Sequence, residues 1–304
     1  MSLDPATADR LKGALATVVA IPVTPFDEAG GIDWDAHARV IRRLTDGGVT
    51  VLTPNGNTGE FYALTPDEAR LATESAIKAA AGDAEVMVGV GLDTATEAAR
   101  HAASHGASMI MIHQPVHPYV STDGWIDYNA QIANQLPDLG VVLYIRNERI
   151  TGEHIAKLAD RAPNIVGVKY GVPDAIRFAK VARDAGLDRF TWLAGAAELT
   201  APMFWTAGAR GFTSGLANVT TGIPLNMFKS LEDNDQGGAM AEWEKARRFE
   251  ELRAAESSAD NVAVVKEALA QLGLCRRDVR PPSRLLPPAI QAEIAGILEG
   301  WGLL

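Results

Sequence analysis

The chain has 304 residues, and its 28 basic and 38 acidic side chains leave a formal net charge of -10. This charge argues against nucleic-acid binding, which depends on clustered Lys and Arg, and no apolar run approaches the roughly 20 residues of a membrane helix. Because the opening segment MSLDPATADRLKG also lacks an apolar secretory core, we expect a water-soluble, cytoplasmic protein that contacts neither nucleic acid nor membrane.

Short β-branched runs recur through the first two thirds of the chain, and each precedes a stretch of helical length and periodicity. The runs predict strands at 17–23, 49–54, 85–91, 108–113, 140–146, 164–171, 190–196 and 209–215. Predicted helices between them include 34–46, 66–82, 95–106, 153–161, 173–185 and 197–207. After about residue 225 the strand signal stops, and 239–256, 260–273 and 287–300 have helical patterns.

Alternation of nearly continuous apolar strands with helices predicts an α/β fold, a closed (β/α)8 TIM barrel. We place the barrel in residues 1–230 and a C-terminal helical extension in residues 231–304. An open doubly wound sheet is the alternative fold. Such a sheet usually carries a GxGxxG turn after its first strand, whereas this chain continues with IPVTPFDEAGG.

Lys169 is the leading candidate for catalysis, because the strand NIVGVKYG places an amine among apolar residues. The active site of a TIM barrel lies at the carboxyl ends of its strands. Desolvation there lowers the pKa of an ammonium group and leaves a neutral amine that can attack a carbonyl carbon. The alternative is a strand-end lysine that only extends to solvent.

Tyr144 ends the preceding strand, so its phenol should lie near Lys169 and could transfer protons. The segment after the second strand contains Gly56, Asn57 and Thr58, whose backbone N–H groups could hold a carboxylate; the Thr58 hydroxyl could also relay a proton. Both features also have purely structural explanations: a core tyrosine hydrogen-bonded to backbone, and an ordinary turn.

Further polar residues fall near predicted strand ends. Arg146 and Arg149 could each pair with a substrate carboxylate or with a neighbouring glutamate. Thr213 and Ser214 end the eighth strand and could face the site or backbone.

His113 and His117 flank the loop after the fourth strand, but no other His, Cys or acidic residue stands at the spacing of a metal site, so we expect no metal site there. The single cysteine, Cys275, cannot form an internal disulfide.

These residues make the chain resemble the dihydrodipicolinate synthase and N-acetylneuraminate lyase family of class I aldolases. The matching motifs are VTPFD at 23–27, GNTGE at 56–60 followed by LTPDE, LY at 143–144, GVKYG around Lys169 and ANV at 217–219. The resemblance implies that Lys169 forms an iminium with a 2-keto acid, that Tyr144 relays protons and that Gly56, Asn57 and Thr58 hold the substrate carboxylate. It also implies a homotetramer, a dimer of dimers, without metal or organic cofactor.

Two departures bear on the substrate. Asn57 replaces the first threonine of the synthase motif GTTGE, and His117 takes the position of the tyrosine that crosses the dimer interface. By contrast, GEFYALTPDE, the segment DTATEAARHAASHGA, the arginine two residues after Tyr144 and VRPPS resemble the 5-dehydro-4-deoxyglucarate dehydratase branch, although YIRNER and GVKYGV differ from that branch's usual YNRDN and GFKDG.

Three functions therefore remain open at the level of sequence. The first is a lyase or dehydratase acting on a 2-keto sugar acid. The second is a dihydrodipicolinate synthase that condenses pyruvate with aspartate semialdehyde through an altered relay. The third is a non-catalytic barrel that binds a keto acid.

Overall fold

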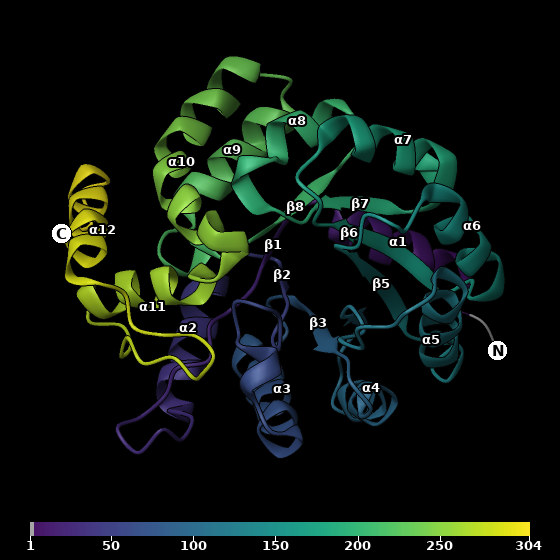
Figure 1. The fold of residues 1–304 in the computed structure, drawn as a ribbon, viewed down its shortest axis with the longest axis horizontal. Helices are drawn as coiled ribbons and strands as arrows, with labels where there is room; N and C mark the ends of the chain where they lie inside the picture. The colour runs from purple at the N-terminus through teal and green to yellow at the C-terminus, as the bar shows by residue number, and fades with distance from the viewer. Residues whose placement is uncertain (1–2) are drawn as a thin grey trace.

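The computed structural model describes residues 3–304 and contains a closed parallel barrel in which the strands pair in chain order, with the last strand beside the first (Figure 1). The strands are Val18–Ala20 (β1), Val51–Leu52 (β2), Glu85–Val90 (β3), Met109–Ile112 (β4), Gly140–Ile145 (β5), Ile165–Tyr170 (β6), Thr191–Ala194 (β7) and Gly211–Ser214 (β8). Each lies inside one of the predicted runs, and the TIM-barrel prediction is confirmed. The first two residues of the predicted barrel segment, 1–230, lie outside the described residues.

Helices follow the strands and surround the barrel (Figure 1). They are Trp34–Asp46 (α2), Pro66–Ala80 (α3), Ala95–Ser104 (α4), Thr122–Asn134 (α5), Gly152–Arg161 (α6), Ala175–Ala185 (α7), Ala201–Thr206 (α8) and Gly222–Glu232 (α9). The predicted list lacked α5 and α9. The sequence does contain a signal for the start of α5, because serine, here Ser121, is a favoured N-cap residue. In the structure the Ser121 hydroxyl accepts a hydrogen bond from the backbone N–H of Gly124.

Helix α1 (Pro5–Leu15), which also had not been predicted, packs against β6 and β7. Its Leu11 and Leu15 are fully buried in the apolar cluster that fills the barrel interior. Burial of each such side chain contributes about 1.5–3 kcal/mol. A second and larger apolar layer lies between the strands and the surrounding helices. The interior is therefore a packed core, and the cavity described below lies at the carboxyl ends of the strands.

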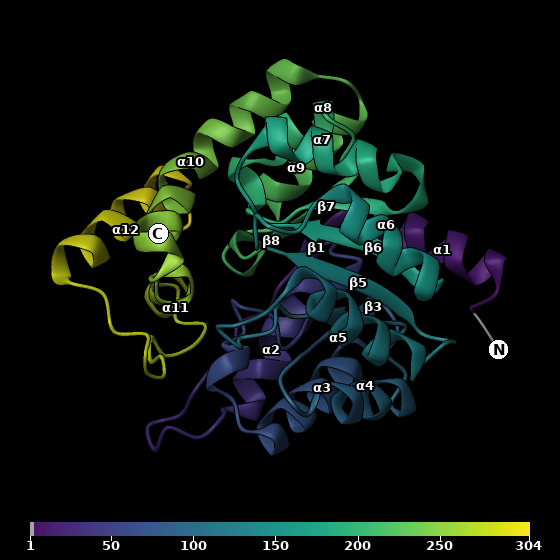
Figure 2. The same ribbon diagram turned by 45° about the vertical axis from the view of Figure 1, so that its right-hand side comes forward.

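The C-terminal extension consists of α10 (Gln236–Ser258), α11 (Asn261–Gln271) and α12 (Pro288–Gly300), which lie together on one side of the barrel (Figure 2). Within α10 the backbone departs from helical angles at Ala255, Glu256 and Ser257. This kink turns the end of α10 toward the strand ends. No helix among residues 3–304 has the length and apolar character needed to cross a membrane.

A buried ion pair joins this extension to the loop after β2. Lys266 of α11, which lies in the predicted helix 260–273, is fully buried and pairs with Glu60. The other oxygen of Glu60 accepts a hydrogen bond from the backbone N–H of Arg280 at 2.9 Å. The Lys266 ammonium also lies 3.9 Å from the centre of the Phe26 ring. These contacts hold the loop containing residues 56–60 against α11.

Candidate active site

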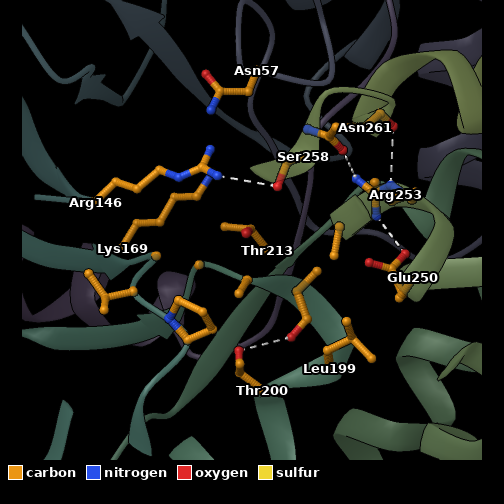
Figure 3. A pocket seen from close by; sticks show the side chains of 18 of the residues that line it. Asn57, Arg146, Lys169, Leu199, Thr200, Thr213, Glu250, Arg253, Ser258 and Asn261 are labelled. Carbon is orange, nitrogen blue, oxygen red and sulfur yellow. Dashed lines mark hydrogen bonds and ion pairs between the residues drawn. The ribbon is translucent and has the colours of Figure 1, made fainter. Parts of the chain in front are cut away.

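A cavity of about 400 Å³ opens at the carboxyl ends of the strands. Residues from β5, β6 and β8, from the loop after β2 and from α10 line it (Figure 3). The predicted site residues that line it are Asn57, Thr58, Tyr144, Arg146, Lys169 and Thr213. One cavity therefore collects side chains from segments far apart in the sequence.

Lys169 points into this cavity from β6, and its partner in the strand register is Tyr144 of β5. Only 2% of its surface is exposed. Burial, together with the like charges of Arg253 and Arg146, lowers the pKa of its amine to about 7. A large fraction of this amine is consequently neutral near pH 7 and able to act as a nucleophile.

Tyr144 lies beside this amine, with the Lys169 nitrogen 4.5 Å from the centre of its ring. The phenol oxygen accepts a hydrogen bond of 3.2 Å from the side-chain amide of Asn57. Burial raises the pKa of the Tyr144 hydroxyl above its usual value. The phenol therefore holds its proton at neutral pH, as a proton donor must.

Two residues of the loop after β2, Asn57 and Thr58, line the cavity. The N–H groups of Gly59 and Glu60 bond to carbonyls inside the loop, whereas in the described part of the chain no protein acceptor bonds those of Asn57 and Thr58. Gly56 does not line the cavity. A Cβ there would lie 2.4 Å from the side chain of Ile21, so glycine is what lets the loop approach β1 so closely.

Arg146 enters the cavity from the loop after β5. Its guanidinium group donates to the carbonyl of Ser257 at 3.0 Å and to the hydroxyl of Ser258 at 3.3 Å (Figure 3). Both acceptors are neutral and belong to the kinked end of α10. The positive charge of Arg146 is thus held at the cavity by neutral groups and stays free to attract an anion.

Arg253 of α10 is a second guanidinium group in the cavity, and sequence reasoning missed it. It donates to Glu250 at 2.5 Å and to the Asn261 side chain at 2.6 Å, and it lies 3.4 Å from the hydroxyl of Thr58. Gly215 makes room for it, because a Cβ there would lie 2.1 Å from the Arg253 side chain. No local pattern separates Arg253 from the other arginines of its helix, so only the fold could identify it.

Ser214, predicted near the substrate, does not line the cavity. Its hydroxyl donates to the buried Glu198 at 2.5 Å and accepts from the backbone N–H of Ala217 at 2.9 Å. Burial, with the nearby negative charge of Glu250, raises the pKa of Glu198 to about 8. This acid therefore stays protonated near pH 7 under the cavity, and Ser214 supports the backbone around it.

The remaining predicted residues lie elsewhere. Arg149 points away from the cavity and donates to the carbonyl of Val120. His117 is exposed on the loop after β4 and accepts a hydrogen bond from the N–H of Tyr119. His113 is buried, with its Nε2 2.8 Å from the Asn55 carbonyl, and burial lowers its pKa to about 4. Neutral and enclosed, His113 positions the loop after β2.

Comparison with known proteins gives consistent matches across the chain. The model of the Dihydrodipicolinate synthetase family matches residues 14–300. A probable 5-dehydro-4-deoxyglucarate dehydratase of Polaromonas naphthalenivorans is 29% identical over 94% of this chain and 95% of its own. A 4-hydroxy-tetrahydrodipicolinate synthase of Hyphomonas neptunium is 31% identical over 92% and 96%. Sequence identity alone does not separate these two activities.

Solved structures show the same likeness. The dihydrodipicolinate synthase from Bacillus clausii superposes with a TM-score of 0.92 at 37% identity, covering 96% of this chain and 99% of that one. The dihydrodipicolinate synthase from Oceanobacillus iheyensis has a TM-score of 0.92 at 34% identity, with coverage of 98% and 100%. The similarity therefore includes the barrel and the C-terminal helices.

Proposed function

Because the chain belongs to the dihydrodipicolinate synthetase family, and is thus a class I aldolase or lyase, we propose that its substrate is a 2-keto sugar acid with a second carboxylate. The reaction would be a dehydration like that of 5-dehydro-4-deoxyglucarate dehydratase. The observation that carries this proposal is the position of Arg146. Its guanidinium group lines the cavity of Lys169 and, among the described residues, donates only to the neutral acceptors of Ser257 and Ser258.

Lys169 is the proposed nucleophile. Its neutral amine attacks the keto carbon and forms a C–N bond, which gives a carbinolamine. The Tyr144 phenol donates its proton to the carbinolamine oxygen, which leaves as water, while the nitrogen keeps its own proton; this gives the iminium and a Tyr144 phenolate. The iminium then withdraws electrons from the neighbouring carbon, whose proton passes to the Tyr144 phenolate to give an enamine. The enamine expels the hydroxyl group on the next carbon, which leaves as water after the Tyr144 phenol has protonated it.

The two ends of a diacid would contact different parts of the cavity. The carboxylate next to the keto group would bind to the backbone N–H groups of Asn57 and Thr58, which lack a protein acceptor within residues 3–304. The distal carboxylate would pair with Arg146 at the rim. A cavity of about 400 Å³ is within the usual size range for small-molecule sites and leaves room beyond a three-carbon keto acid.

Dihydrodipicolinate synthase activity is the second candidate, supported by the likeness to structures of that name. Asn57 disfavours it. This side chain donates its amide hydrogen to the Tyr144 oxygen, and an amide cannot pass a proton onward as a threonine hydroxyl does. A keto-acid-binding protein without turnover is the third candidate, and loss of the relay hydroxyl at position 57 is what supports it.

We also propose that the protein acts as a homotetramer, a dimer of dimers, without metal or organic cofactor in the active site. The loop after β4 supports the oligomer, because its Tyr119 is 88% exposed and its Val116 is 62% exposed. Large apolar side chains gathered on one exposed loop are typical of interaction surfaces.

Trapping of the iminium tests the chemistry. Borohydride reduction in the presence of 5-dehydro-4-deoxyglucarate or pyruvate, followed by peptide mass spectrometry, is expected to place an adduct on Lys169 and none in Lys169→Ala. An adduct on another lysine, or none with any 2-keto acid, would refute the proposal.

Turnover measurements test the substrate. We expect dehydration of 5-dehydro-4-deoxyglucarate and no condensation of pyruvate with aspartate semialdehyde. Arg146→Gln should raise KM for the diacid at least about tenfold, the cost of one charged hydrogen bond, while pyruvate trapping persists. Arg149→Gln, three residues away but outside the cavity, is the matched control. Equal effects of the two substitutions would argue against a diacid substrate.

A further inference from the structure

Helices α3 and α4 lie side by side on the outside of the barrel (Figure 2). Two histidines and a glutamate meet between these helices. They are Glu74 of α3, His101 of α4 and His105, which caps the end of α4. Their potential ligand atoms all lie within 4.8 Å of one another. We propose that these three side chains bind a divalent transition metal ion of the zinc type, at a site separate from the cavity of Lys169.

The spacing of the histidines suits chelation. His101 and His105 are four residues apart, so consecutive helical turns bring their rings to the same face, with centres 4.2 Å apart. Two imidazoles at this spacing on a helix form the usual half of a zinc site. Glu74 supplies a third ligand from the neighbouring helix, and a water molecule would complete a tetrahedral shell.

The second ring nitrogen of His105 is already oriented for this role. Its Nδ1 lies 2.9 Å from the backbone carbonyl of His101, to which it can only donate. In the neutral ring this bond leaves the lone pair on Nε2, which lies 3.9 Å from the carboxylate oxygen of Glu74. Metal-binding histidines characteristically donate their other N–H group to a carbonyl in this way.

His101 provides a second, independent indication. Its Nε2 is buried and makes no hydrogen bond within the described residues, although the Glu74 oxygen is only 3.2 Å away. The two atoms are close but poorly aligned for a hydrogen bond. Ligand atoms around one tetrahedral zinc ion, each about 2.1 Å from it, lie roughly 3.4 Å apart. The observed separation matches two ligands directed at a common point.

The donor set selects the class of metal. Two imidazole nitrogens and one carboxylate oxygen suit Zn²⁺, Co²⁺ or Ni²⁺, whereas Mg²⁺ and Ca²⁺ prefer oxygen ligands. The site is half exposed, so a metal ion can reach it. A bound ion would link α3 to α4, and α3 begins directly after the loop that presents Asn57 and Thr58 to the cavity. Its expected effect is on stability and not on the chemical step.

Metal titration of the full-length protein without a histidine tag tests the proposal. Calorimetry with Zn²⁺ should give one equivalent bound per chain, and Co²⁺ should give the visible absorption of a tetrahedral complex. Zn²⁺ at a hundredfold excess over Kd should raise Tm by about 5 °C. Mg²⁺ should produce neither effect.

Single substitutions locate the site. His105→Asn, His101→Gln and Glu74→Gln should each raise the Kd for Zn²⁺ at least about tenfold. His154→Gln is the control, because His154 is a histidine on another helix and glutamine can preserve its cap with Thr151. Unchanged Zn²⁺ affinity in the three variants, or equal loss in His154→Gln, would overturn the proposal. If one variant fails to fold, the Zn²⁺ affinities of the other two still test the proposal.

Discussion

Lys169 sets the pH dependence expected of this enzyme. Burial lowers its pKa to about 7, and only the neutral amine attacks a ketone. As pH falls through 7 the amine becomes protonated, so kcat/KM should decrease on the acid side and level off above about pH 8. A pH–rate profile for the preferred keto acid measures this. A profile flat from pH 6 to 9 would contradict it.

Substitution of Arg146 provides a second test of the pH dependence of kcat/KM. Its positive charge disfavours a second positive charge on Lys169, so Arg146→Gln should raise the Lys169 pKa and move the acid side of the profile to higher pH. Arg149→Gln, outside the cavity, should leave the midpoint where it is. A shift to lower pH in Arg146→Gln would show that another group controls the profile.

Tyr144 is the residue proposed to move protons. Tyr144→Phe keeps the ring against Lys169 but removes the hydroxyl, so kcat should fall by about 10²–10⁴-fold with little change in Tm. Tyr170→Phe is a matched control, because Tyr170 lies on the neighbouring strand and its buried hydroxyl has no hydrogen-bond partner in the described chain. Steady-state kinetics of both variants measure kcat and show whether only Tyr144→Phe lowers it. Equal losses would indicate a packing effect and not a proton relay.

At the scale of elements, the contact between the loop after β2 and α11 determines how the site is held. Lys266→Met leaves the carboxylate of Glu60 buried without its cation, which should cost about 3–5 kcal/mol of unfolding free energy. Urea denaturation measures the loss. The double variant Glu60→Gln, Lys266→Met should be more stable than Lys266→Met alone, since it buries no unpaired charge.

An exposed ion pair provides the comparison for this element. Lys157 and Asp123 pair on the surface between α6 and α5. Water screens such pairs, so Lys157→Met should destabilise the fold much less than Lys266→Met. Similar losses in the two variants would mean that burial of the Glu60 and Lys266 pair has little energetic consequence.

At the scale of the whole molecule, a dimer of dimers needs two different self-complementary surfaces. The exposed apolar loop that contains Tyr119 is one candidate, and α7, where Ile176 is 86% exposed, is the other. Tyr119→Asp and Ile176→Asp should each reduce the proposed tetramer to dimers, and together they should give monomers. Sedimentation velocity measures these masses. Leu71→Asp, on an isolated exposed leucine of α3, should leave the tetramer intact, and a monomeric wild type would contradict the assembly.

The barrel and the proximity of Tyr144 to Lys169 could be predicted from the amino-acid sequence alone. Buried parallel strands are continuous apolar runs, and a lysine or tyrosine at the end of such a run is visible without knowledge of any neighbour. Consecutive strands of a TIM barrel are adjacent, so the proximity of these two residues followed from chain order, and the structure pairs them in the strand register.

The residues that complete the cavity from outside the strands could not be predicted from the sequence, because they come from distant segments that the fold brings together. Arg253 lies 195 residues beyond Thr58 in the chain yet contacts it, and the kink in α10 places Ser257 and Ser258 against Arg146. Likewise Glu74 reaches His101 from a different helix. Periodicity reports which face of an element is buried. It carries no information about which distant side chain lies opposite, and that depends on how the closed barrel and its helices pack.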